Sequence, residues 1–353
     1  MTKPVFGTII YDNVIMSINK NKVTIKDVAR KAGVSPATAS RVAGNYGYTS
    51  KTSRRKVLAA IQELGYRPNF VARSMVTKYT HTLGLIVTDI TNPFFAQLMR
   101  SVEDIAWEAG YTLFLANTDE NPEREKAIIQ TILERQVDGL ILVPASSQPA
   151  PYLEHFLQQG IPLVLLDRNV RGLSVDTVMV DNENGAFKAV THLIHLGHHR
   201  IGMVIDNLDI STNTERLAGY RRAYQEAGLP VDEHLIQSCQ FTEQSAFNLT
   251  ITLLNQPDRP TALFAANNFM TLGILRATRE ANLRIPEDIA LVGFDELDWT
   301  GISPLQITTV AQPVHELGSI AAQRLLVRLL GDQTSPMEIR LNTKFIIRKS
   351  CGE

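Results

Sequence analysis

The stretch from Thr24 to Ala43 constrains the fold of this chain more than any other part of the sequence. Its first half spaces apolar residues as one stripe of a helix, and Thr24 with Asp27 makes the pattern of a capping box at its start. Gly33 can end this helix in the left-handed conformation, and Ser35-Pro36 is typical of the start of a second helix. Two short helices joined by a tight turn predict a helix-turn-helix.

The second predicted helix buries Ala39, Val42 and Ala43 and leaves small, polar or cationic side chains exposed. In a helix-turn-helix this exposed helix enters the DNA major groove, where Pro36 and Ala37 can contact thymine methyls and Arg41 a guanine or a phosphate. An ordinary helical hairpin inside a protein core is the alternative interpretation. The candidate DNA-binding residues of this stretch are Thr24, Ser35, Pro36, Ala37, Thr38, Ser40 and Arg41.

The distribution of charge favours a nucleic-acid-binding N-terminal segment. Residues 1–80 hold 14 lysines and arginines against three acidic residues, a net charge of +11. The other 273 residues hold 21 basic and 33 acidic residues, a net charge of −12, so the overall charge of −1 hides two opposite halves. A basic segment beside a helix-turn-helix is the electrostatic pattern of a DNA-binding protein, although a basic segment can also be a solvated surface.

Length and composition argue against several classes of protein. A chain of 353 residues predicts two or three domains. Its only cysteines, Cys239 and Cys351, argue against a disulfide framework or a cysteine zinc site and fit a reducing cytoplasm. No apolar run has the length of a membrane span, and no signal peptide is evident. We therefore expect a cytoplasmic protein with no membrane partner.

A third helix is expected to begin after Ser50 and to end at Gly65. Its predicted buried face consists of Val57, Leu58, Ile61 and Leu64. The basic residue Arg54, near the start of this helix, is a candidate phosphate contact.

From residue 82 onward, short β-rich runs alternate with amphipathic helical stretches. Runs such as LGLIV, DGLILV and IALVGF are typical of strands that are buried on both faces, as in parallel sheets. This alternation predicts doubly wound parallel sheets, and there are too many units for one sheet. We expect two lobes, with late strands near residues 307–310 and 345–347 crossing back between them.

Polar residues directly follow several of these predicted strands. They are Asp89, Asp167-Arg168, Asn267-Asn268 and Asp295. Ligands of open α/β sheets bind beyond the carboxyl ends of the strands, so these residues are candidates for a binding site. Each of them could instead cap the helix that follows, and only their convergence would indicate a site.

The stretch 24–43 and several motifs of the core resemble the lactose-repressor/galactose-repressor family of bacterial transcriptional regulators. The core motifs are Asn92-Pro93-Phe94-Phe95, Leu166-Asp167-Arg168, Glu215 to Tyr220, Val292 to Asp295 and Thr308 to Pro313. The resemblance implies an α/β, two-lobed, periplasmic-binding-protein-like core of doubly wound parallel sheets, preceded by a small all-α helix-turn-helix head.

The resemblance also implies the domain organisation and a hinge. We expect a disordered extension over 1–21, with Met16 as an alternative start, a helix-turn-helix domain over 22–66, a hinge over 67–80, and an effector-binding and dimerisation core over 81–350. In the family the hinge becomes helical on operator DNA and inserts a side chain into the minor groove. Here Asn69, Ala72, Arg73 and Met75 would contact DNA, with Met75 where leucine is usual. A passive linker is the alternative.

The same resemblance implies a small sugar or sugar derivative bound between the lobes. Phe94 and Phe95 would stack on the sugar ring, and the polar residues would hydrogen-bond its hydroxyls. The polar set that the resemblance implies is Asp167, Arg168, Arg216, Asn267, Asp295 and Gln312, and the strand-end residue Asp89 is a further candidate effector contact. Asp167 and Asp295 offset Arg168 and Arg216, so we expect a near-neutral cleft that favours a neutral sugar over a sugar phosphate, with a carboxylate on Arg216 left open. Asn268 stands where the family usually has Asp.

No catalytic constellation, cofactor motif or metal site is predicted. His192, His195, His198 and His199 cluster in the sequence, but no acidic residue or cysteine is spaced with them as a ligand set. His315-Glu316 begins like a zinc-protease motif, but Ser319 stands where the second histidine is required. We therefore do not expect an enzyme.

The sequence thus predicts a sugar-responsive transcriptional regulator, most simply a repressor of carbohydrate-utilisation genes. A homodimer would read a near-palindromic operator in double-stranded DNA, because a two-fold protein reads a two-fold site. The alternatives are a sugar-binding protein of a transport system without a DNA-binding role and a sugar-modifying enzyme. The identity of the sugar, its role as inducer or corepressor, the operator sequence, and dimer against tetramer stay open at this point.

Overall fold

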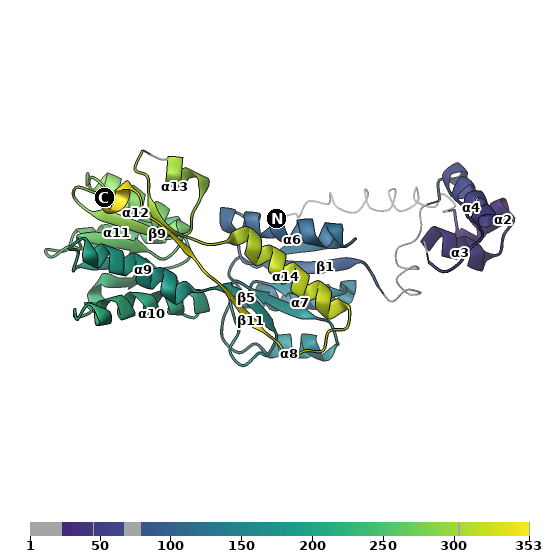
Figure 1. Ribbon diagram of the computed structural model, residues 1–353, viewed down its shortest axis with the longest axis horizontal. Coiled ribbons are helices and arrows are strands. Elements are labelled where there is room, and N and C mark those ends of the chain that lie inside the picture. The colour runs from purple at the N-terminus through teal and green to yellow at the C-terminus, as the bar shows by residue number, and fades with distance from the viewer. Residues whose placement is uncertain (1–22, 45, 67–78, 303, 353) are drawn as a thin grey trace, which may run out of the picture. The chain divides into compact units, whose positions relative to one another are not determined.

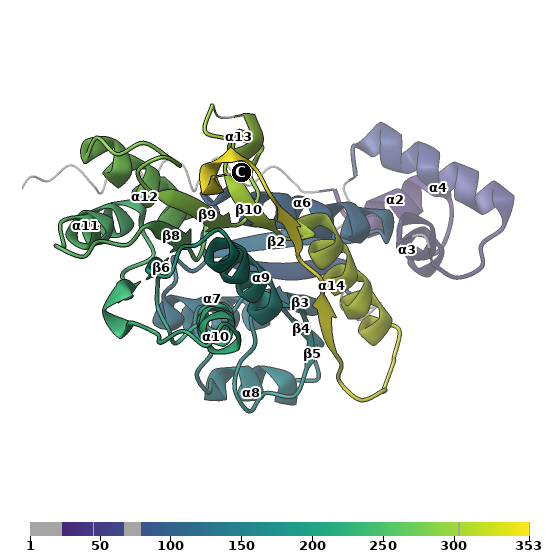
Figure 2. The same cartoon turned by 60° about the vertical axis from the view of Figure 1, so that its left-hand side comes forward.

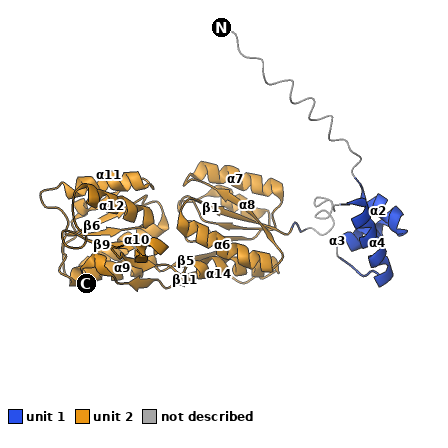
Figure 3. Ribbon diagram, turned by 90° about the horizontal axis from the view of Figure 1, so that it is seen from above, with its two compact units in different colours: residues 1–80 blue, residues 81–353 orange. Residues whose placement is uncertain are grey.

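The computed structural model describes residues 23–44, 46–66, 79–302 and 304–352 (Figure 1). The chain divides into two compact units, Met1–Thr80 and His81–Glu353, which are described separately here (Figure 3). The predicted extension over 1–21 and most of the predicted hinge, including Asn69, Ala72, Arg73 and Met75, lie outside the described residues.

The described part of the first unit is a bundle of three helices, α2 (Ile25–Ala32), α3 (Pro36–Gly44) and α4 (Lys51–Leu64). The Thr24 backbone N–H donates to the Asp27 carboxylate at 2.9 Å, and Gly33 ends α2 with φ +65°. Ser50 caps α4 by accepting from the Ser53 backbone N–H at 3.2 Å. These local signals start and stop the helices where the sequence predicts.

The small core of this unit is built mostly from alanine and valine. Its buried members are Val28, Ala29, Ala32, Ala39, Val42, Val57 and Ala60. The prediction that Leu58 belongs to the buried face of α4 is wrong, since Leu58 is 48% exposed. The buried stripe of α4 consists of Val57, Ala60, Ile61 and Leu64. Leu58 directly follows Val57, so its side chain points about 100° around the helix axis from that of Val57.

The second unit consists of two lobes, each with a six-stranded sheet. The N-lobe sheet has the order β11-β5-β4-β3-β1-β2 and the C-lobe sheet the order β12-β10-β9-β8-β6-β7. The N-lobe strands are β1 (Thr82–Val87), β2 (Thr112–Asn117), β3 (Gly139–Leu142), β4 (Leu163–Leu166), β5 (Asp176–Val180) and β11 (Glu338–Leu341). The C-lobe strands are β6 (Ile201–Ile205), β7 (Ile236–Ser238), β8 (Ala262–Ala265), β9 (Ala290–Phe294), β10 (Thr308–Ala311) and β12 (Lys344–Ile346). Only β10 and β12 pair antiparallel among the described strands.

Helices cover both faces of each sheet (Figures 1 and 2). In the N-lobe, α6 (Pro93–Glu108) and α14 (Val314–Leu329) pack on one face, and α7 (Pro122–Arg135) and α8 (Pro151–Gln158) on the other. In the C-lobe, α9 (Asn182–His195) and α10 (Ser211–Glu226) pack on one face, and α11 (Glu243–Leu254) and α12 (Asn268–Glu280) on the other. The remaining short elements are α13 (Asp298–Ile302), η1 (Glu233–Leu235) and η2 (Lys349–Cys351). This arrangement confirms the predicted fold class.

The chain passes between the lobes three times, after β5, between β10 and α14, and between β11 and β12 (Figure 1). We expected the strands near 307–310 and 345–347 to cross back, but β10 and β12 both stay in the C-lobe sheet. The strand that returns to the N-lobe is β11, which pairs with β5. Its sequence EIRL is short and half polar, so it lacks the apolar run that marks a buried strand. No helix in the described ranges is long and apolar enough to cross a bilayer.

Close packing of α9 on α10 generates a test of the fold. A Cβ at Gly219 would lie 2.1 Å from the Glu183 carbonyl oxygen, and this backbone neighbour has no room to move. Gly219→Ala should therefore lower the free energy of unfolding by about 2 kcal/mol, although alanine is the better helix former. Urea unfolding measures the change. The exposed control Gln225→Ala, on the same helix, should change it by less than about 0.5 kcal/mol, and an unchanged stability of Gly219→Ala would contradict the packing.

Candidate functional site

The predicted DNA-reading side of the first unit faces outward in the structure. Ser35, Pro36, Ala37 and Arg41 are exposed, and Thr38 and Ser40 are half-buried. Thr24, at the start of α2, and Arg54, on α4, are exposed as well. The structure therefore leaves this set of side chains accessible to a partner, as a groove-binding helix requires.

Local contacts hold α3 and the loop after it in place. The Ser35 hydroxyl accepts from the Thr38 backbone N–H at 3.2 Å, which caps the helix. The hydroxyls of Ser40 and Tyr46 lie 2.9 Å apart, and the Tyr46 backbone N–H donates to the Arg41 carbonyl at 3.0 Å. Gly47, with φ +69°, lets the chain turn beside the aliphatic part of Arg41. The guanidinium of Arg41 forms no ion pair with any described residue.

A pocket lies between the two lobes of the second unit. Its walls come from the carboxyl ends of strands in both sheets and from the helices that follow them, as expected for an open α/β fold. The lining residues are Asn92, Phe94, Phe95, Asp167, Arg168, Asp206, Thr212, Asn213, Arg216, Phe241, Asn267, Asp295 and Gln312.

Eight of the nine predicted effector residues line this pocket, and Asp89 does not. The Asp89 carboxylate instead accepts from the backbone N–H and the hydroxyl of Thr91, at 2.8 and 2.6 Å, and so fixes the loop before α6. Sequence reasoning missed Asn92, Asp206, Thr212, Asn213 and Phe241. Asp206 follows the strand β6 directly, so the strand-end rule would have found it, whereas Phe241 lies in a loop without such a signal.

Aromatic rings reach the pocket from both lobes. Phe94 and Phe95, in the first turn of α6, meet edge to face with ring centroids 5.1 Å apart. Phe241, from the C-lobe, packs edge to face on Phe269 at 5.3 Å. These contacts hold the rings, which offer apolar faces to a bound molecule from two directions.

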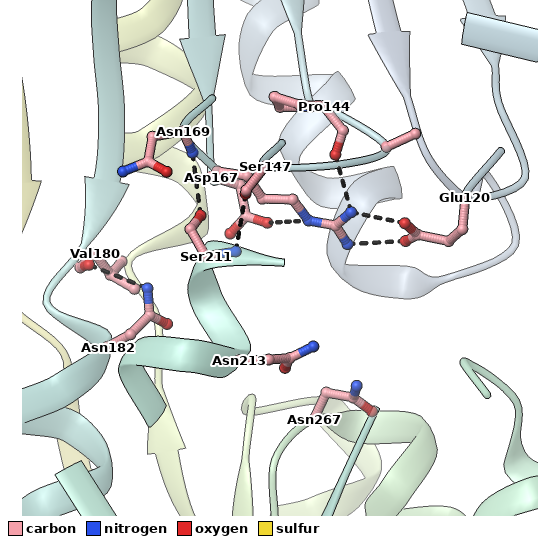
Figure 4. Close-up of polar contacts among 12 residues, drawn as sticks. Glu120, Pro144, Ser147, Asp167, Asn169, Val180, Asn182, Ser211, Asn213 and Asn267 are labelled. Carbon is pink, nitrogen blue, oxygen red and sulfur yellow. Dashed lines mark hydrogen bonds and ion pairs between the residues drawn. The ribbon is translucent and has the colours of Figure 1, made fainter. Parts of the chain in front are cut away.

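Two guanidinium groups are buried at the pocket, and both are anchored by the protein. Arg168 donates to the Glu120 carboxylate at 2.7 and 2.8 Å and to the Pro144 carbonyl at 3.0 Å (Figure 4). Arg216 donates to the Asn182 amide oxygen at 2.9 Å and to the Ala266 carbonyl at 2.6 Å. Burial lowers the pKa of Arg216, and its guanidinium stacks 3.8 Å from the centroid of the Phe294 ring.

Three carboxylates face these guanidiniums. Asp295 accepts from the Gln312 amide at 2.6 Å and from the Asn268 backbone N–H at 3.2 Å. Asp206 accepts from the Asn267 amide at 2.6 Å and from the Asn213 amide. Asp167 has one oxygen 3.6 Å from the Arg168 Nε, and its other oxygen accepts no hydrogen bond from any residue that the structure describes. Burial raises the pKa of both Asp167 and Asp206 to about 6, against the attraction of Arg168.

The hydrogen-bonding capacity of the pocket is incomplete. Among the described residues, Asp167 Oδ1 and Gln312 Oε1 are buried acceptors without a donor, and Arg168 Nε forms an ion pair with Asp167 Oδ2 at 3.6 Å but donates no hydrogen bond. Buried polar atoms normally have hydrogen-bond partners, so these three atoms indicate a ligand that carries both hydrogen-bond donors and acceptors. A molecule with several hydroxyl groups, which donate and accept, would supply all three contacts.

Direct contacts between the lobes surround the pocket. The side-chain amides of Asn92 and Asn268 pair across it, with the Asn268 amide donating at 2.7 Å. Ser211 donates its backbone N–H to the Ser147 hydroxyl at 2.9 Å and accepts from the Asn169 backbone N–H at 3.2 Å (Figure 4). Asn268, where the resemblance anticipates Asp, thus joins the lobes and does not line the pocket.

The histidines that cluster in the sequence have other neighbours in the structure. His192 Nε2 lies 3.3 Å from Cys351 Sγ, and His198 Nδ1 lies 3.0 Å from the Thr261 hydroxyl. Within the described ranges, no three histidine, cysteine or acidic side chains converge as a metal site.

Comparison with known proteins gives two consistent matches to family profiles. "Bacterial regulatory proteins, lacI family" matches residues 24–69, and "Periplasmic binding proteins and sugar binding domain of LacI family" matches residues 80–349. The HTH-type transcriptional repressor PurR of Photobacterium profundum is 35% identical over 331 residues, which cover 94% of this chain and 99% of that protein.

Two solved structures extend the comparison. The Lac repressor dimer bound to operator and the anti-inducer ONPF superposes with a TM-score of 0.83 at 27% identity, covering 94% of this chain and 99% of that one. A LacI family transcriptional regulator from Enterococcus faecium with bound ribose superposes with a TM-score of 0.68 at 32% identity, covering 76% of this chain and 98% of that one.

The buried carboxyl of Asp167 generates a pH-dependent prediction. Its pKa is about 6 in the folded protein and near 3.9 in an unfolded chain, so folding favours its neutral form. That contribution to stability is present at low pH and is lost as the pH rises through 6. Asp167→Asn, which keeps the shape and suits the backbone φ of +68°, should be more stable than the wild type by about 3 kcal/mol at pH 7.5 and by only about 1 kcal/mol at pH 4.5, because pH 4.5 still lies slightly above the unfolded-state pKa.

Chemical unfolding at the two pH values measures this difference. The exposed Asp258→Asn serves as the matched control and should show no such pH-dependent gain. A stability difference between Asp167→Asn and the wild type that is the same at both pH values would contradict the prediction.

Proposed function

The chain belongs to the LacI family of bacterial regulatory proteins, and we propose that within this family it is a repressor of carbohydrate-utilisation genes controlled by a sugar or sugar derivative. As a family member it is a DNA-binding transcriptional regulator and not an enzyme, with a core that binds a small molecule. The nature of that molecule and of the controlled genes is the proposal.

The incomplete hydrogen bonding of the lobe pocket carries this proposal. Unpartnered acceptors on Asp167 and Gln312 and an unpartnered donor on Arg168 lie in one pocket with the rings of Phe94 and Phe241. Hydroxyl groups would pair with the polar atoms, and the apolar C–H face of a sugar ring would lie on a phenyl ring. The ribose-bound regulator from Enterococcus faecium supports a monosaccharide.

The DNA-binding part of the proposal assigns roles to the exposed face of α3. Ala37 and Pro36 would contact thymine methyls, and Arg41 would contact a guanine or a phosphate. Asn69, Ala72, Arg73 and Met75, outside the described residues, would form a hinge that binds the minor groove. A homodimer would read a near-palindromic operator, and the Lac repressor dimer bound to operator supports this assembly.

Coupling between the two binding events would work through lobe closure. A sugar in the pocket contacts both lobes, so it stabilises one relative arrangement of them. An arrangement of the lobes that orders the proposed hinge would raise operator affinity. An arrangement that disorders this hinge would lower operator affinity.

A ligand screen tests the proposed effector. Melting temperatures of the full chain are measured against ribose, glucose, cellobiose and inositol, because a ligand that binds only the folded state raises the melting temperature. At least one monosaccharide should raise it, and Phe241→Leu should weaken that binding by about tenfold through loss of an aromatic face. Phe247→Leu, which removes a ring beneath Arg276 outside the pocket, is the control. A folded protein that responds to none of the sugars would contradict the carbohydrate effector.

Replacing Arg41 tests the DNA-reading face. A duplex site is first selected from random sequences by the wild-type protein. Arg41→Ala should reduce the preference for that site over random DNA by tenfold or more, since a bidentate base contact contributes about 1–3 kcal/mol of discrimination. Gel-shift titrations at one salt concentration measure the ratio. The exposed Gln62→Ala on α4 should leave the ratio unchanged, and equal preference in Arg41→Ala and wild type would contradict a base contact by Arg41.

A further inference from the structure

The guanidinium of Arg168 is already occupied by a carboxylate of the protein. Its two terminal nitrogens face the two oxygens of Glu120 at 2.7 and 2.8 Å, and one of them also donates to the Pro144 carbonyl at 3.0 Å (Figure 4). This paired geometry is the one by which arginine binds the carboxylates and phosphates of ligands. Glu120 therefore fills the position that an anionic ligand would take on Arg168.

The backbone holds Glu120 in this place. Glu120 lies in the turn between β2 and α7, and it and Asp119 have left-handed φ values of +54° and +52°. The Glu120 N–H donates to the Thr88 carbonyl at 3.3 Å, and the Asn121 N–H donates to the Thr118 carbonyl at 3.1 Å. Two consecutive non-glycine residues with positive φ are uncommon and concentrate at functional sites. The contact between Glu120 and Arg168 is thus built into the loop.

Charges around the pocket add to the same effect. Asp167, Asp206 and Asp295 line it together with two guanidiniums, and Glu120 behind Arg168 brings the sum to four negative and two positive groups. The expectation of a near-neutral cleft omitted Asp206 and Glu120, so it is wrong. The second guanidinium, on Arg216, is engaged by Asn182 and Ala266. A phosphate or carboxylate would enter a net negative pocket without a vacant cation.

We propose that Glu120 is a specificity-determining residue that excludes anionic effectors because its carboxylate already pairs with the guanidinium of Arg168. This inference rests on the proposed effector site. Uncharged sugars need no vacant guanidinium and still find the unpartnered Asp167 Oδ1, Gln312 Oε1 and Arg168 Nε. Phosphorylated or oxidised forms of the same sugar are rejected. The regulator would therefore respond to a sugar before its phosphorylation and not to the phosphate ester.

Glu120→Gln tests this proposal because it removes the charge and keeps the size of the side chain. Calorimetric titrations of the full chain with ribose, ribose 5-phosphate and inorganic phosphate are made at constant ionic strength. The wild type should bind both phosphate compounds only weakly, with dissociation constants well above that for ribose. Glu120→Gln should bind inorganic phosphate and ribose 5-phosphate at least about tenfold more tightly than the wild type, while its affinity for ribose changes less.

Four further variants separate the proposed effect from general electrostatics and from a structural effect of the substitution. Asp206→Asn removes the same charge from the pocket without vacating a guanidinium, and it should raise phosphate affinity by less than about threefold. Glu120→Gln combined with Arg168→Gln should lose the gain. Glu123→Gln, an exposed neighbour at the start of α7, should behave as the wild type. Glu120→Asn is a second way to free Arg168. Asparagine tolerates the left-handed backbone at this position, and its side chain is too short to pair with both terminal nitrogens of the Arg168 guanidinium.

The outcomes distinguish this proposal from the proposed function. Phosphate affinity that stays at the wild-type value in folded Glu120→Gln and Glu120→Asn would overturn the role of Glu120, as would an equal gain in Asp206→Asn. Wild-type binding of ribose 5-phosphate as tight as that of ribose would overturn it too. If no sugar binds the wild type, the proposed effector class fails, but titration with inorganic phosphate still decides whether Glu120 blocks Arg168.

Discussion

Burial of two guanidiniums between the lobes is the constraint on which the rest of the pocket depends. Removing such charges from water costs several kcal/mol each unless hydrogen bonds and opposite charges compensate. Glu120 and the Pro144 carbonyl compensate Arg168, and Asn182 and the Ala266 carbonyl compensate Arg216. These contacts hold both guanidiniums in place, and the buried polar atoms that have no hydrogen-bond partner among the described residues are available to a ligand.

This arrangement links the fold to regulation. The carboxyl ends of parallel strands in both sheets meet at one pocket. A small molecule bound there therefore touches residues of both lobes at once. Pairs such as Asn92 with Asn268 and Ser147 with Ser211 join the same lobes directly. A bound molecule would add to these contacts and stabilise one arrangement of the two lobes. In this way a small ligand would change the conformation of a much larger domain.

Local signals explain why much of this was predictable from the sequence. Capping residues and glycines set the three head helices, and strand ends marked Asp167, Asn267 and Asp295, since strand geometry brings those positions to one edge. Other features depend on tertiary structure. Glu120 reaches Arg168 through a left-handed turn 48 residues earlier in the chain, and β11 is a strand only because β5 offers it an edge. Asp89 also follows a strand, but its carboxylate accepts hydrogen bonds from Thr91 and does not line the pocket.

Coupling between the lobe pocket and the DNA-binding head would make effector binding and operator binding depend on each other, and this reciprocity can be measured. Fluorescence titrations measure the dissociation constant of the operator with and without saturating effector, and that of the effector with and without saturating operator. With coupling, both ratios differ from one and equal each other, because the coupling free energy is shared by the two sites. An effector that binds the pocket tightly while both ratios stay at one would contradict the account.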